Sequence, residues 1–401
     1  MANSMNLNKK QPALWGGEPI FSGPKPTSNL VKPSEETFFQ YAYRIFDKKR
    51  SFTRGELVSE LEGRLKILHN VEYCITFNSG FWALAALIDS GVLKGKKEVV
   101  LPSLTYRRMG DIISWVGLIP HFSDINRETL AIDSQSARKC INDNTGLIIG
   151  VHPVGGHCDI DGLLRLSEET GVPVIFDGVE SVDEKHKGKK IGSFGAGELF
   201  SLGASKLVNG FEGGYITTND QRLAMELQKI RSGDQSLADL RVMKAELNEV
   251  HAAMTLAGLD DLEQQLNRNR NRYNAYKRHL ACVEGLELFP HIEENDPSYK
   301  NIVVEVTEAW PYTREETIQL LNAENILARA YYYPPLTQTN ISYSYKSSSM
   351  TSTDYVAGHF ISMPCGHFVD LGDIQVIIDY LKYLKENASD FKKKLQRGGT
   401  P

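Results

Sequence analysis

The sequence predicts an α/β protein in which a large domain, built on a mostly parallel sheet between helices, is followed by a smaller α+β domain. Short apolar runs alternate with helical patterns over residues 71–177. These runs are Val/Ile-rich without strict alternation, which is typical of strands buried on both faces of a parallel sheet. The chain has 401 residues, and chains of this length usually fold around more than one hydrophobic core. We expect an N-terminal arm and first helix over residues 1–50, a large domain over 51–275 and a small domain over 276–401.

Turn-forming residues, a helix-capping pattern and the spacing of leucines predict the first structural elements. Residues 11–34 are rich in Pro, Gly and Ser and predict an irregular arm. Thr53-Arg54-Gly55-Glu56 has the pattern of a capping box, and it precedes leucines at helical spacing, namely Leu57, Leu61, Leu65 and Leu68. The strands expected next are 71–77, 98–101, 146–151 and 173–176, with helices over 81–89 and 108–115.

The second half contains a long charged stretch and then a new strand-helix pattern. Charge density rises over residues 223–278, where Leu259, Leu262 and Leu266 predict a long, basic, Asn-rich helix. The Asn/Arg run 267–272 of this helix favours a solvated face or a connector between domains. Nucleic-acid binding is the weaker interpretation of that run, because the net charge is acidic and no aromatic residues interleave. The elements expected after Phe289 are a strand over 302–306, a helix over 313–322, a strand over 326–330 and a final helix over 371–394.

Composition narrows the class of protein. The formal net charge of −5 gives no electrostatic reason to bind nucleic acid or an anionic membrane. Residues 1–10 are polar, without the apolar core of a signal peptide, and no apolar run is long enough to span a bilayer. The five cysteines are scattered, with no Cys-x-x-Cys pair. We therefore expect reduced thiols in a cytoplasmic protein and no metal site.

A single lysine stands out in the segment 200–206, Phe-Ser-Leu-Gly-Ala-Ser-Lys. Lys206 follows a predicted strand end and precedes the glycine-rich turn 210–214. Upstream, the apolar run 172–176 ends in Asp177. A lysine that forms an imine, with an acid that holds a protonated pyridine nitrogen, is the pair that pyridoxal 5′-phosphate (PLP) chemistry requires. For Lys206 to act, its amine must be free, and we expect burial beside other charges to lower its pKa.

Other candidate residues follow neighbouring strands. Ser79 and Gly80 lie between a strand and a helix, where backbone amides bind anions such as a cofactor phosphate; a plain helix cap is the alternative. Tyr106 follows the next strand and either stacks on a pyridine ring or belongs to the core. Taken alone, Asp177 is equally well a cap, and Glu180 lies either beside the cofactor's phenolic oxygen or in solvent.

The order of motifs along the chain resembles one known family. NSGxxAL, PSxTY, VHPVGGxxD, DGVES, GSFGxxxxFSLGASK, EGGYITTND and RAYYYPPL follow one another between residues 78 and 336. Together they resemble the DegT/DnrJ/StrS family of PLP-dependent sugar aminotransferases, over roughly residues 50 to 385. The resemblance implies PLP fold type I, with a seven-stranded sheet in the large domain. It also implies a homodimer with active sites at the subunit interface.

The family's functional residues carry over position by position. The resemblance implies that Lys206 forms the internal aldimine and shuttles the proton, and that Asp177 pairs with the pyridinium. Tyr106 would stack on the ring and Glu180 would lie near its oxygen. The phosphate would be bound by Ser79, Gly80 and Ser201. Arg329, in the segment 329–336 that also holds Tyr331, would lie near the substrate entrance.

Four positions, in three places along the chain, depart from the family pattern. Phe81 stands where a phosphate-binding threonine is common, and Lys244 stands where an asparagine reaches the phosphate across the dimer. A lysine there replaces a hydrogen bond by a charge contact, or the loop has another use. Arg107 and Arg108 replace small residues and add positive charge near the pocket mouth, which suits an acceptor with a nucleotide diphosphate or a phosphate.

The sequence thus predicts a transaminase that moves an amino group from an amino acid, most simply L-glutamate, to a ketone on a nucleotide-linked or phosphorylated sugar or a cyclitol. Two alternatives stay open. Some relatives dehydrate sugars with PLP, but they carry histidine in place of the lysine at position 206. A catalytically silent regulatory homologue is the other, and the Phe81 and Lys244 departures are its support.

Overall fold

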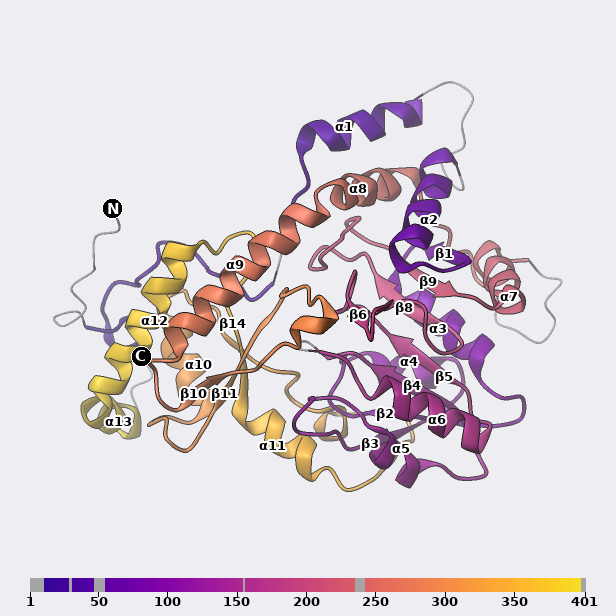
Figure 1. Ribbon diagram of the computed structural model, residues 1–401. Coiled ribbons are helices and arrows are strands. Elements are labelled where there is room, and N and C mark those ends of the chain that lie inside the picture. Colours follow the sequence, from indigo (N-terminus) through magenta and orange to yellow (C-terminus); the bar gives the residue numbers. More distant parts are fainter. Residues whose placement is uncertain (1–10, 29–30, 47–54, 154–155, 235–241, 398–401) are drawn as a thin grey trace.

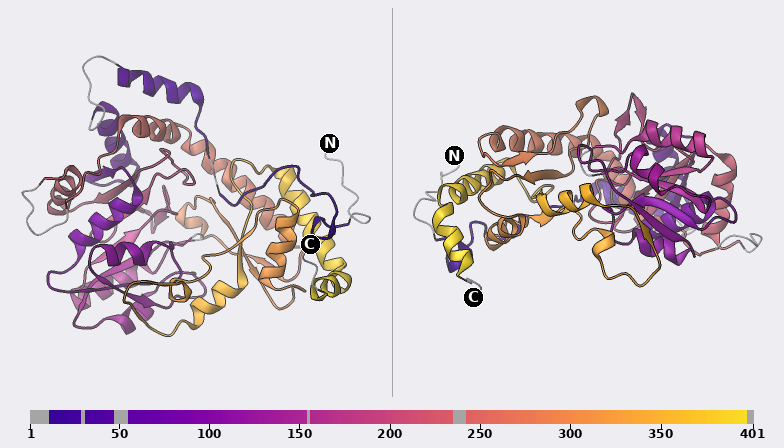
Figure 2. Two further views of the ribbon diagram at one scale, coloured as in Figure 1. Left: turned by 180° about the vertical axis from the view of Figure 1, so that it is seen from behind. Right: turned by 90° about the horizontal axis from the view of Figure 1, so that it is seen from below.

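The computed structural model describes residues 11–28, 31–46, 55–153, 156–234 and 242–397. Two lobes lie side by side, each with its own sheet, and the long helix α9 (Leu262–Leu280) runs from one to the other (Figures 1 and 2). The Asn/Arg run 267–272 lies within α9. Its Asn269 is buried and its Arg272 donates from Nε to the carbonyl of Val369 at 2.7 Å. The run thus lies in the helix that passes between the two lobes, and it is partly buried instead of forming a purely solvated face.

The large sheet has eight strands in the order β1-β9-β8-β5-β4-β2-β3-β13. Its strands are β1 (Tyr73–Phe77), β9 (Gly214–Thr218), β8 (Glu198–Ser201), β5 (Val174–Asp177), β4 (Thr145–Val151), β2 (Glu98–Pro102), β3 (Ile119–Ser123) and β13 (Lys346–Ser347). β9 is antiparallel to both its neighbours, and the pairs from β8 to β13 are parallel. The expected sheet is confirmed, with eight strands instead of seven.

The eighth strand explains the difference. β13 is two residues long and pairs with His121 and Phe122 of β3. It comes from a segment far downstream, so neither its length nor its composition marks it as part of this sheet. It also lies within the predicted small domain, 276–401, although it pairs with the large sheet. The predicted domain boundaries otherwise stay a prediction.

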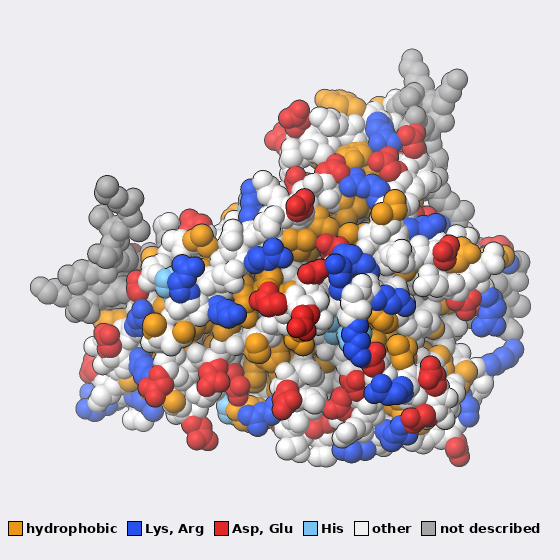
Figure 3. Space-filling view, in the orientation of Figure 1, with side chains coloured by type: hydrophobic (Ala, Val, Ile, Leu, Met, Phe, Trp, Pro, Cys, Tyr) orange, Lys and Arg blue, Asp and Glu red, His pale blue; other side chains and the backbone are white. Residues whose placement is uncertain are grey.

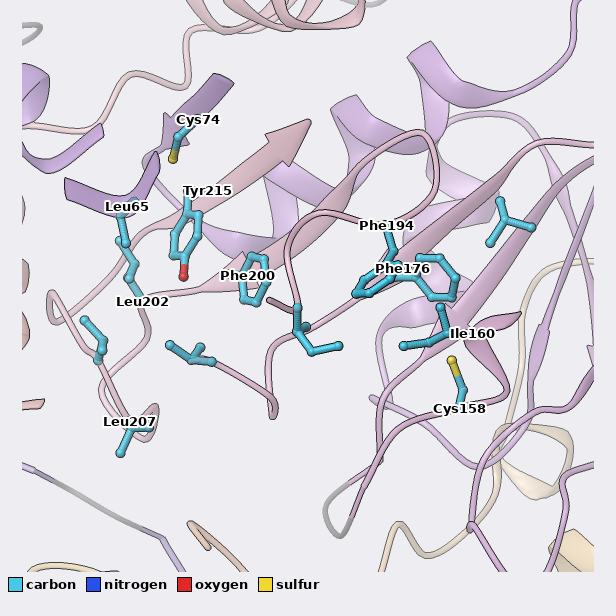
Figure 4. Packing of buried hydrophobic residues seen from close by; sticks show 14 of the residues in the cluster. Leu65, Cys74, Cys158, Ile160, Phe176, Phe194, Phe200, Leu202, Leu207 and Tyr215 are labelled. Atoms are coloured by element: carbon cyan, nitrogen blue, oxygen red, sulfur yellow. The ribbon is translucent and has the colours of Figure 1, made fainter. Parts of the chain in front are cut away.

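Helices cover both faces of the large sheet. One buried cluster packs α2 (Glu56–His69), α5 (Ser134–Cys140) and α6 (Ile160–Thr170) on one face; a second packs α3 (Gly80–Gly91), α4 (Met109–Trp115) and α7 (Gln221–Ser232) on the other. Figure 4 shows part of the first cluster. There the rings of Phe200 and Tyr215 stack with centroids 4.8 Å apart. This packing fixes β8 just before Ser201.

The start of α2 differs from its prediction. Thr53 and Arg54 lie outside the described residues, and the helix begins at Glu56 with Gly55 as N-cap and without a side-chain cap from its own segment. The buried carboxylate of Glu249, at the start of α8 (Glu249–Asp260), accepts instead from the amides of Gly55, Leu57 and Val58 at 2.9–3.1 Å. The cap thus comes from a residue that is remote in sequence.

The small sheet is antiparallel, in the order β10-β11-β14-β12. Its strands are β10 (Leu286–Leu288), β11 (Ile302–Val306), β14 (Phe360–Met363) and β12 (Arg329–Ala330), and its helices are α10 (Arg314–Ala323), α11 (Thr351–His359), α12 (Leu371–Glu386) and α13 (Ala388–Gln396). The predicted final helix is two helices. They meet at Asn387, whose backbone amide and side-chain amide both donate to the carbonyl of Tyr383, at 3.2 and 2.9 Å, so that a side-chain bond competes there for a helix acceptor.

The N-terminal arm is irregular, as predicted, but it is packed on the small lobe. Apart from the short 3-10 helix Ala13–Trp15 it has no helix before α1 (Glu35–Tyr43) in its described part. The buried carboxylate of Glu324 accepts from the amides of Ala13 and Ile20 at 2.7 and 2.8 Å. Among the described helices, none combines the length and the apolar character that a membrane crossing needs.

Candidate active site

The predicted site residues gather where neighbouring parallel strands end. Asp177 is the last residue of β5 and Ser201 is the last of β8, and these two strands are adjacent. Lys206 lies in the turn that follows β8. Ligands of α/β sheets bind at such carboxyl ends. The sheet order therefore brings Lys206 and Asp177 to one edge, as the sequence pattern requires.

A cavity of about 570 Å³ opens over this edge. Six of the residues singled out in the sequence line it: Tyr106, Arg107, Glu180, Lys206, Arg329 and Tyr331. Tyr106 is 46 % exposed, as suits a ring that covers a ligand, so the core alternative for it is wrong. Tyr331 is buried and packs mainly within an apolar cluster that includes Leu104.

Charge in the cavity is organised around Glu180. The Lys206 amine donates to its Oε1 at 2.8 Å, and Asn301 donates from Nδ2 to its Oε2 at 2.9 Å. Lys300 also donates to Oε2. Burial raises the pKa of the Glu180 carboxyl, but the two lysines outweigh burial and hold that pKa well below its ordinary value. The solvent alternative for Glu180 is therefore wrong.

The same contacts correct the expectation for Lys206. Burial lowers the pKa of the Lys206 amine, as expected, but the charge and hydrogen bond of Glu180 outweigh burial. The pKa of Lys206 is consequently above its ordinary value when no ligand separates the two groups. A neighbouring carboxylate at hydrogen-bond distance stabilises the ammonium more than partial burial destabilises it.

Among the described residues, no cationic side chain is hydrogen-bonded to Asp177. The side chain is buried and accepts one hydrogen bond, from the amide of Val179 at 3.1 Å. Burial raises the pKa of Asp177 to about 6, against the opposing influence of that hydrogen bond and of the Lys206 charge. A buried carboxyl in this state gains most from a cationic partner such as a protonated pyridine nitrogen.

Small residues form a cradle beside these groups. Ser79 caps α3 by accepting from the amide of Trp82 at 3.2 Å, so the cap alternative for Ser79 holds. A Cβ on Gly80 would lie 3.1 Å from Cβ and Oγ of Ser201, and one on Gly214 would lie 2.6 Å from Cα of Gly80. Three chain segments thus pack closely at the N-terminus of α3, where positions 80 and 214 leave little room for a side chain, and they bring the backbone amides of the helix beside the hydroxyl of Ser201, a combination of donors that suits an anion.

Unsatisfied buried atoms nearby also fit a bound group. Among the described residues, Oδ1 of Asn78, Oγ1 of Thr105 and Oγ of Ser181 are buried without a hydrogen-bond partner. They lie one position from Ser79, Tyr106 and Glu180 respectively. In native proteins, buried polar atoms are rarely left without a hydrogen-bond partner. The residues present thus fit a phosphate-bearing pyridine cofactor.

The departures from the family pattern have separate structural settings. Phe81 packs edge-on against Trp82, with ring centroids 5.0 Å apart, so it belongs to the core and offers no hydroxyl. Lys244 is exposed, next to Ala245, whose carbonyl accepts from the amide of Asn78 at 2.8 Å. It therefore lies near the cradle without lining the cavity. Arg108 is 57 % exposed and pairs with Asp111 at 3.1 Å, whereas Arg107 lines the cavity.

Sequence reasoning missed Lys300 and Asn301. They precede β11 in the small lobe, over 90 residues after Lys206, and their spacing matches no motif. The only available signal was a lysine and an asparagine directly before a predicted apolar strand, and that pattern is common at surfaces. Among the described residues, no cluster of three or more His, Cys, Asp or Glu side chains is arranged to hold a metal ion.

The profile of the DegT/DnrJ/EryC1/StrS aminotransferase family matches residues 33–382. The chain belongs to this family. The protein is accordingly a transaminase, and its cofactor is PLP, as in the family.

Individual relatives agree with this membership. GDP-perosamine synthase of Escherichia coli O157:H7 is 26% identical over 358 residues, which cover 88% of this chain and 94% of the relative. The L-glutamine:2-deoxy-scyllo-inosose aminotransferase of Micromonospora echinospora is 25% identical over 281 residues, covering 64% of this chain and 66% of the relative. The crystal structure of DesI in the presence of its TDP-sugar product superposes with a TM-score of 0.90 at 26% identity, covering 96% of this chain and 98% of DesI.

Proposed function

We propose that the protein transfers an amino group from an amino acid, with L-glutamate as the donor to test first, to a ketone on a nucleotide-linked or phosphorylated sugar or a cyclitol. The proposal is carried by the position of Lys206, which follows β8 and lines the cavity, beside the buried Asp177 at the end of the adjacent strand β5, whose side chain does not itself line the cavity. The relatives named above support the acceptor class, since by name they act on a GDP-sugar, a TDP-sugar and a cyclitol ketone.

Each residue has a role in this proposal. When bound, PLP supplies an electron sink for the negative charge that develops at the substrate carbon. Lys206 holds the cofactor, and its amine then moves the proton at that carbon. Asp177 keeps the ring nitrogen protonated, since its buried carboxylate gains from a cation there. Glu180 accepts hydrogen bonds from Lys206, Lys300 and Asn301. Tyr106 would cover the ring.

The cradle supplies the phosphate contacts. We assign the cofactor phosphate to the amide end of α3, with Ser79 and Gly80, and to the hydroxyl of Ser201. The Ser201 hydroxyl accepts from the amide of Gly203 at 3.3 Å, which leaves its own proton for a phosphate oxygen. Lys244 adds positive charge near this end, either in its own subunit or across a dimer.

The acceptor side of the cavity is cationic. Arg107 and Arg329 line it together with Lys206 and Lys300, and Glu180 is the one carboxylate among its lining residues in the described chain. Arg107 also borders a neighbouring hollow of about 260 Å³. This suits an acceptor that carries a phosphate or diphosphate. We expect Arg107→Ala to raise the acceptor KM clearly more than Arg108→Ala, because Arg108 is already paired with Asp111; equal effects would contradict this assignment.

We also propose a cytoplasmic homodimer. The five cysteines are all free thiols. Around α1 several large apolar side chains are exposed: Phe39, Tyr43, Phe46, Phe211 and Val250. Orange hydrophobic surface is visible at α1, at the top of Figure 3. Exposed apolar patches of this kind mark association surfaces. Sedimentation of the parent and of a Phe39→Ser/Tyr43→Ser variant tests the dimer, which requires that the parent be dimeric and the variant dissociate.

The visible absorbance spectrum with PLP, taken before and after L-glutamate and beside Lys206→Ala, tests the reaction. A band of lysine-bound cofactor in the parent, bleached by L-glutamate and absent in Lys206→Ala, is expected. A band that persists with L-glutamate would mean another donor or another PLP reaction. The absence of any band in the parent would overturn the assignment in favour of a silent homologue.

A further inference from the structure

A second buried lysine contacts the same carboxylate as Lys206. Lys300 is 5 % exposed and donates to Oε2 of Glu180, the oxygen that Lys206 leaves free. Asn301 donates to that same oxygen. One carboxylate thus bridges two amines, one from the turn after β8 in the large lobe and one from the segment before β11 in the small lobe.

The segment that carries Lys300 is held at a fixed place. The amide of Ser298 donates to Oε1 of Glu184 at 2.9 Å, and Oε2 of Glu184 contacts Nε2 of His157 at 2.9 Å. Glu180 and Glu184, four positions apart, thus bind residues 298–301 from both ends. The thiol of Cys365 also contacts the carbonyl of Lys300 at 3.3 Å. Because these partners are buried, the Lys300 amine has little freedom to leave Glu180.

The charges facing Lys300 come from several elements. Glu180 follows β5, Lys206 follows β8, and Arg329 lies on β12 across the same cavity; Cys365, which follows β14, is a neutral thiol near neutral pH because burial raises its pKa to about 11. Burial lowers the pKa of Lys300, Glu180 raises it, and the charge of Lys206 lowers it again. Electrostatic coupling between two titrating groups is reciprocal. Because Lys300 and Lys206 donate to the two oxygens of one carboxylate, the charge of Lys300 therefore opposes protonation of Lys206. Asp177 and Tyr106 also act on Lys206, and both raise the pKa of its amine.

We propose that Lys300 is a positioning residue that acts on Lys206 through Glu180: it occupies one carboxylate oxygen and prevents Glu180 from serving as the counter-ion of Lys206 alone. This rests on the proposed function, in which Lys206 must present a neutral amine. Without Lys300, Glu180 and Lys206 form a simple buried ion pair, which holds the amine protonated and out of use. With Lys300 present, Glu180 keeps a cationic partner when Lys206 loses its proton.

The test measures Lys206 itself in the full-length protein freed of cofactor. Brief labelling with a limiting amount of acetic anhydride, over a series of pH values, gives the midpoint at which Lys206 becomes reactive, read by mass spectrometry of its peptide. We expect Lys300→Met to move this midpoint upward by about one pH unit, the order of magnitude for one unit charge a few ångströms away in a protein site. At neutral pH, PLP should then bind about tenfold more slowly.

Lys300→Arg and Lys25→Met are the matched variants. Arginine keeps the charge, so Lys300→Arg should leave the Lys206 midpoint at or below that of the parent. Lys25→Met removes an ion pair to Asp373 outside the cavity and should leave the Lys206 midpoint unchanged. Should Lys300→Met fail to fold, a Lys206 midpoint raised in Lys300→Arg would equally refute the proposal.

The proposal and the proposed function fail in different ways. An unchanged Lys206 midpoint in folded Lys300→Met refutes the role of Lys300, even if the parent forms the lysine-bound cofactor band. Absence of that band in the parent refutes the proposed function, whereas the labelling midpoints still decide whether Lys300 controls Lys206.

Discussion

Replacing Asp177 by asparagine is expected to raise the thermal stability of the protein without cofactor. The same substitution should reduce the additional stability that the protein gains when it binds PLP. The carboxyl is buried and has one hydrogen bond, from the amide of Val179. In Asp177→Asn the side-chain carbonyl oxygen would keep that bond, and the side chain would carry no charge. The buried charge is a cost that a bound pyridinium offsets.

The size of the effect follows from the pKa. Burial raises the pKa of Asp177 from 3.8 to about 6, and a shift of two units corresponds to roughly 3 kcal/mol. Because the pKa of Asp177 is raised in the folded state, its ionisation does not destabilise the fold below the pKa of the unfolded chain, 3.8. The destabilisation grows as pH rises from there through the folded-state pKa of about 6. The increase in the free energy of unfolding caused by Asp177→Asn should therefore be close to zero at about pH 4 and should reach nearly its full value by about pH 7.

Thermal unfolding followed by circular dichroism across this pH range measures the gain. We expect the variant to melt roughly 5 °C above the parent at neutral pH without cofactor. Glu184→Gln is the matched control: Glu184 is also buried, but His157 and Ser298 outweigh burial and lower the pKa of its carboxyl, so this variant should be destabilised. Saturating PLP should raise the melting temperature of the parent more than that of Asp177→Asn. A difference between variant and parent that is the same at both ends of the pH range would refute the reasoning.

Two further predictions concern the cap of α2 and the cradle. Glu249→Gln should lower the free energy of unfolding by about 1–2 kcal/mol, because one carboxylate accepts from three amides at the start of α2; an unchanged urea midpoint would show that the cap is dispensable. Gly80→Ala should weaken PLP binding at least about tenfold, because the new methyl lies 3.1 Å from Ser201. Gly63→Ala, in α2 with open space around its Cβ, is the matched control for the Kd measured by cofactor fluorescence, and equal Kd values in the two variants would contradict the cradle.

Much of the large sheet was predictable from local patterns. The strands β1, β2, β4 and β5 are predominantly apolar, with few polar residues such as Thr76 and Glu98, because burial on both faces admits little else. Asp177 and Lys206 could be found for the same reason, since each interrupts or follows such a run with a charge. β12 was not predictable in length: two residues pair with β14, while Ile326 instead forms a bridge with Lys25 of the N-terminal arm.

The sequence by itself determined the α/β architecture and the family, and it predicted the lysine and acid of the candidate site, because these depend on residue types at short spacing. The tertiary structure alone decided which remote groups meet them. Glu249 caps a helix that lies nearly 200 positions upstream, and β13 extends a sheet that is otherwise built from residues 73–218. Lys300 shares Glu180 with Lys206 although nothing in its local sequence marks it. Long-range contacts depend on how whole elements pack, and a buried charge takes its pKa from whichever partners that packing supplies.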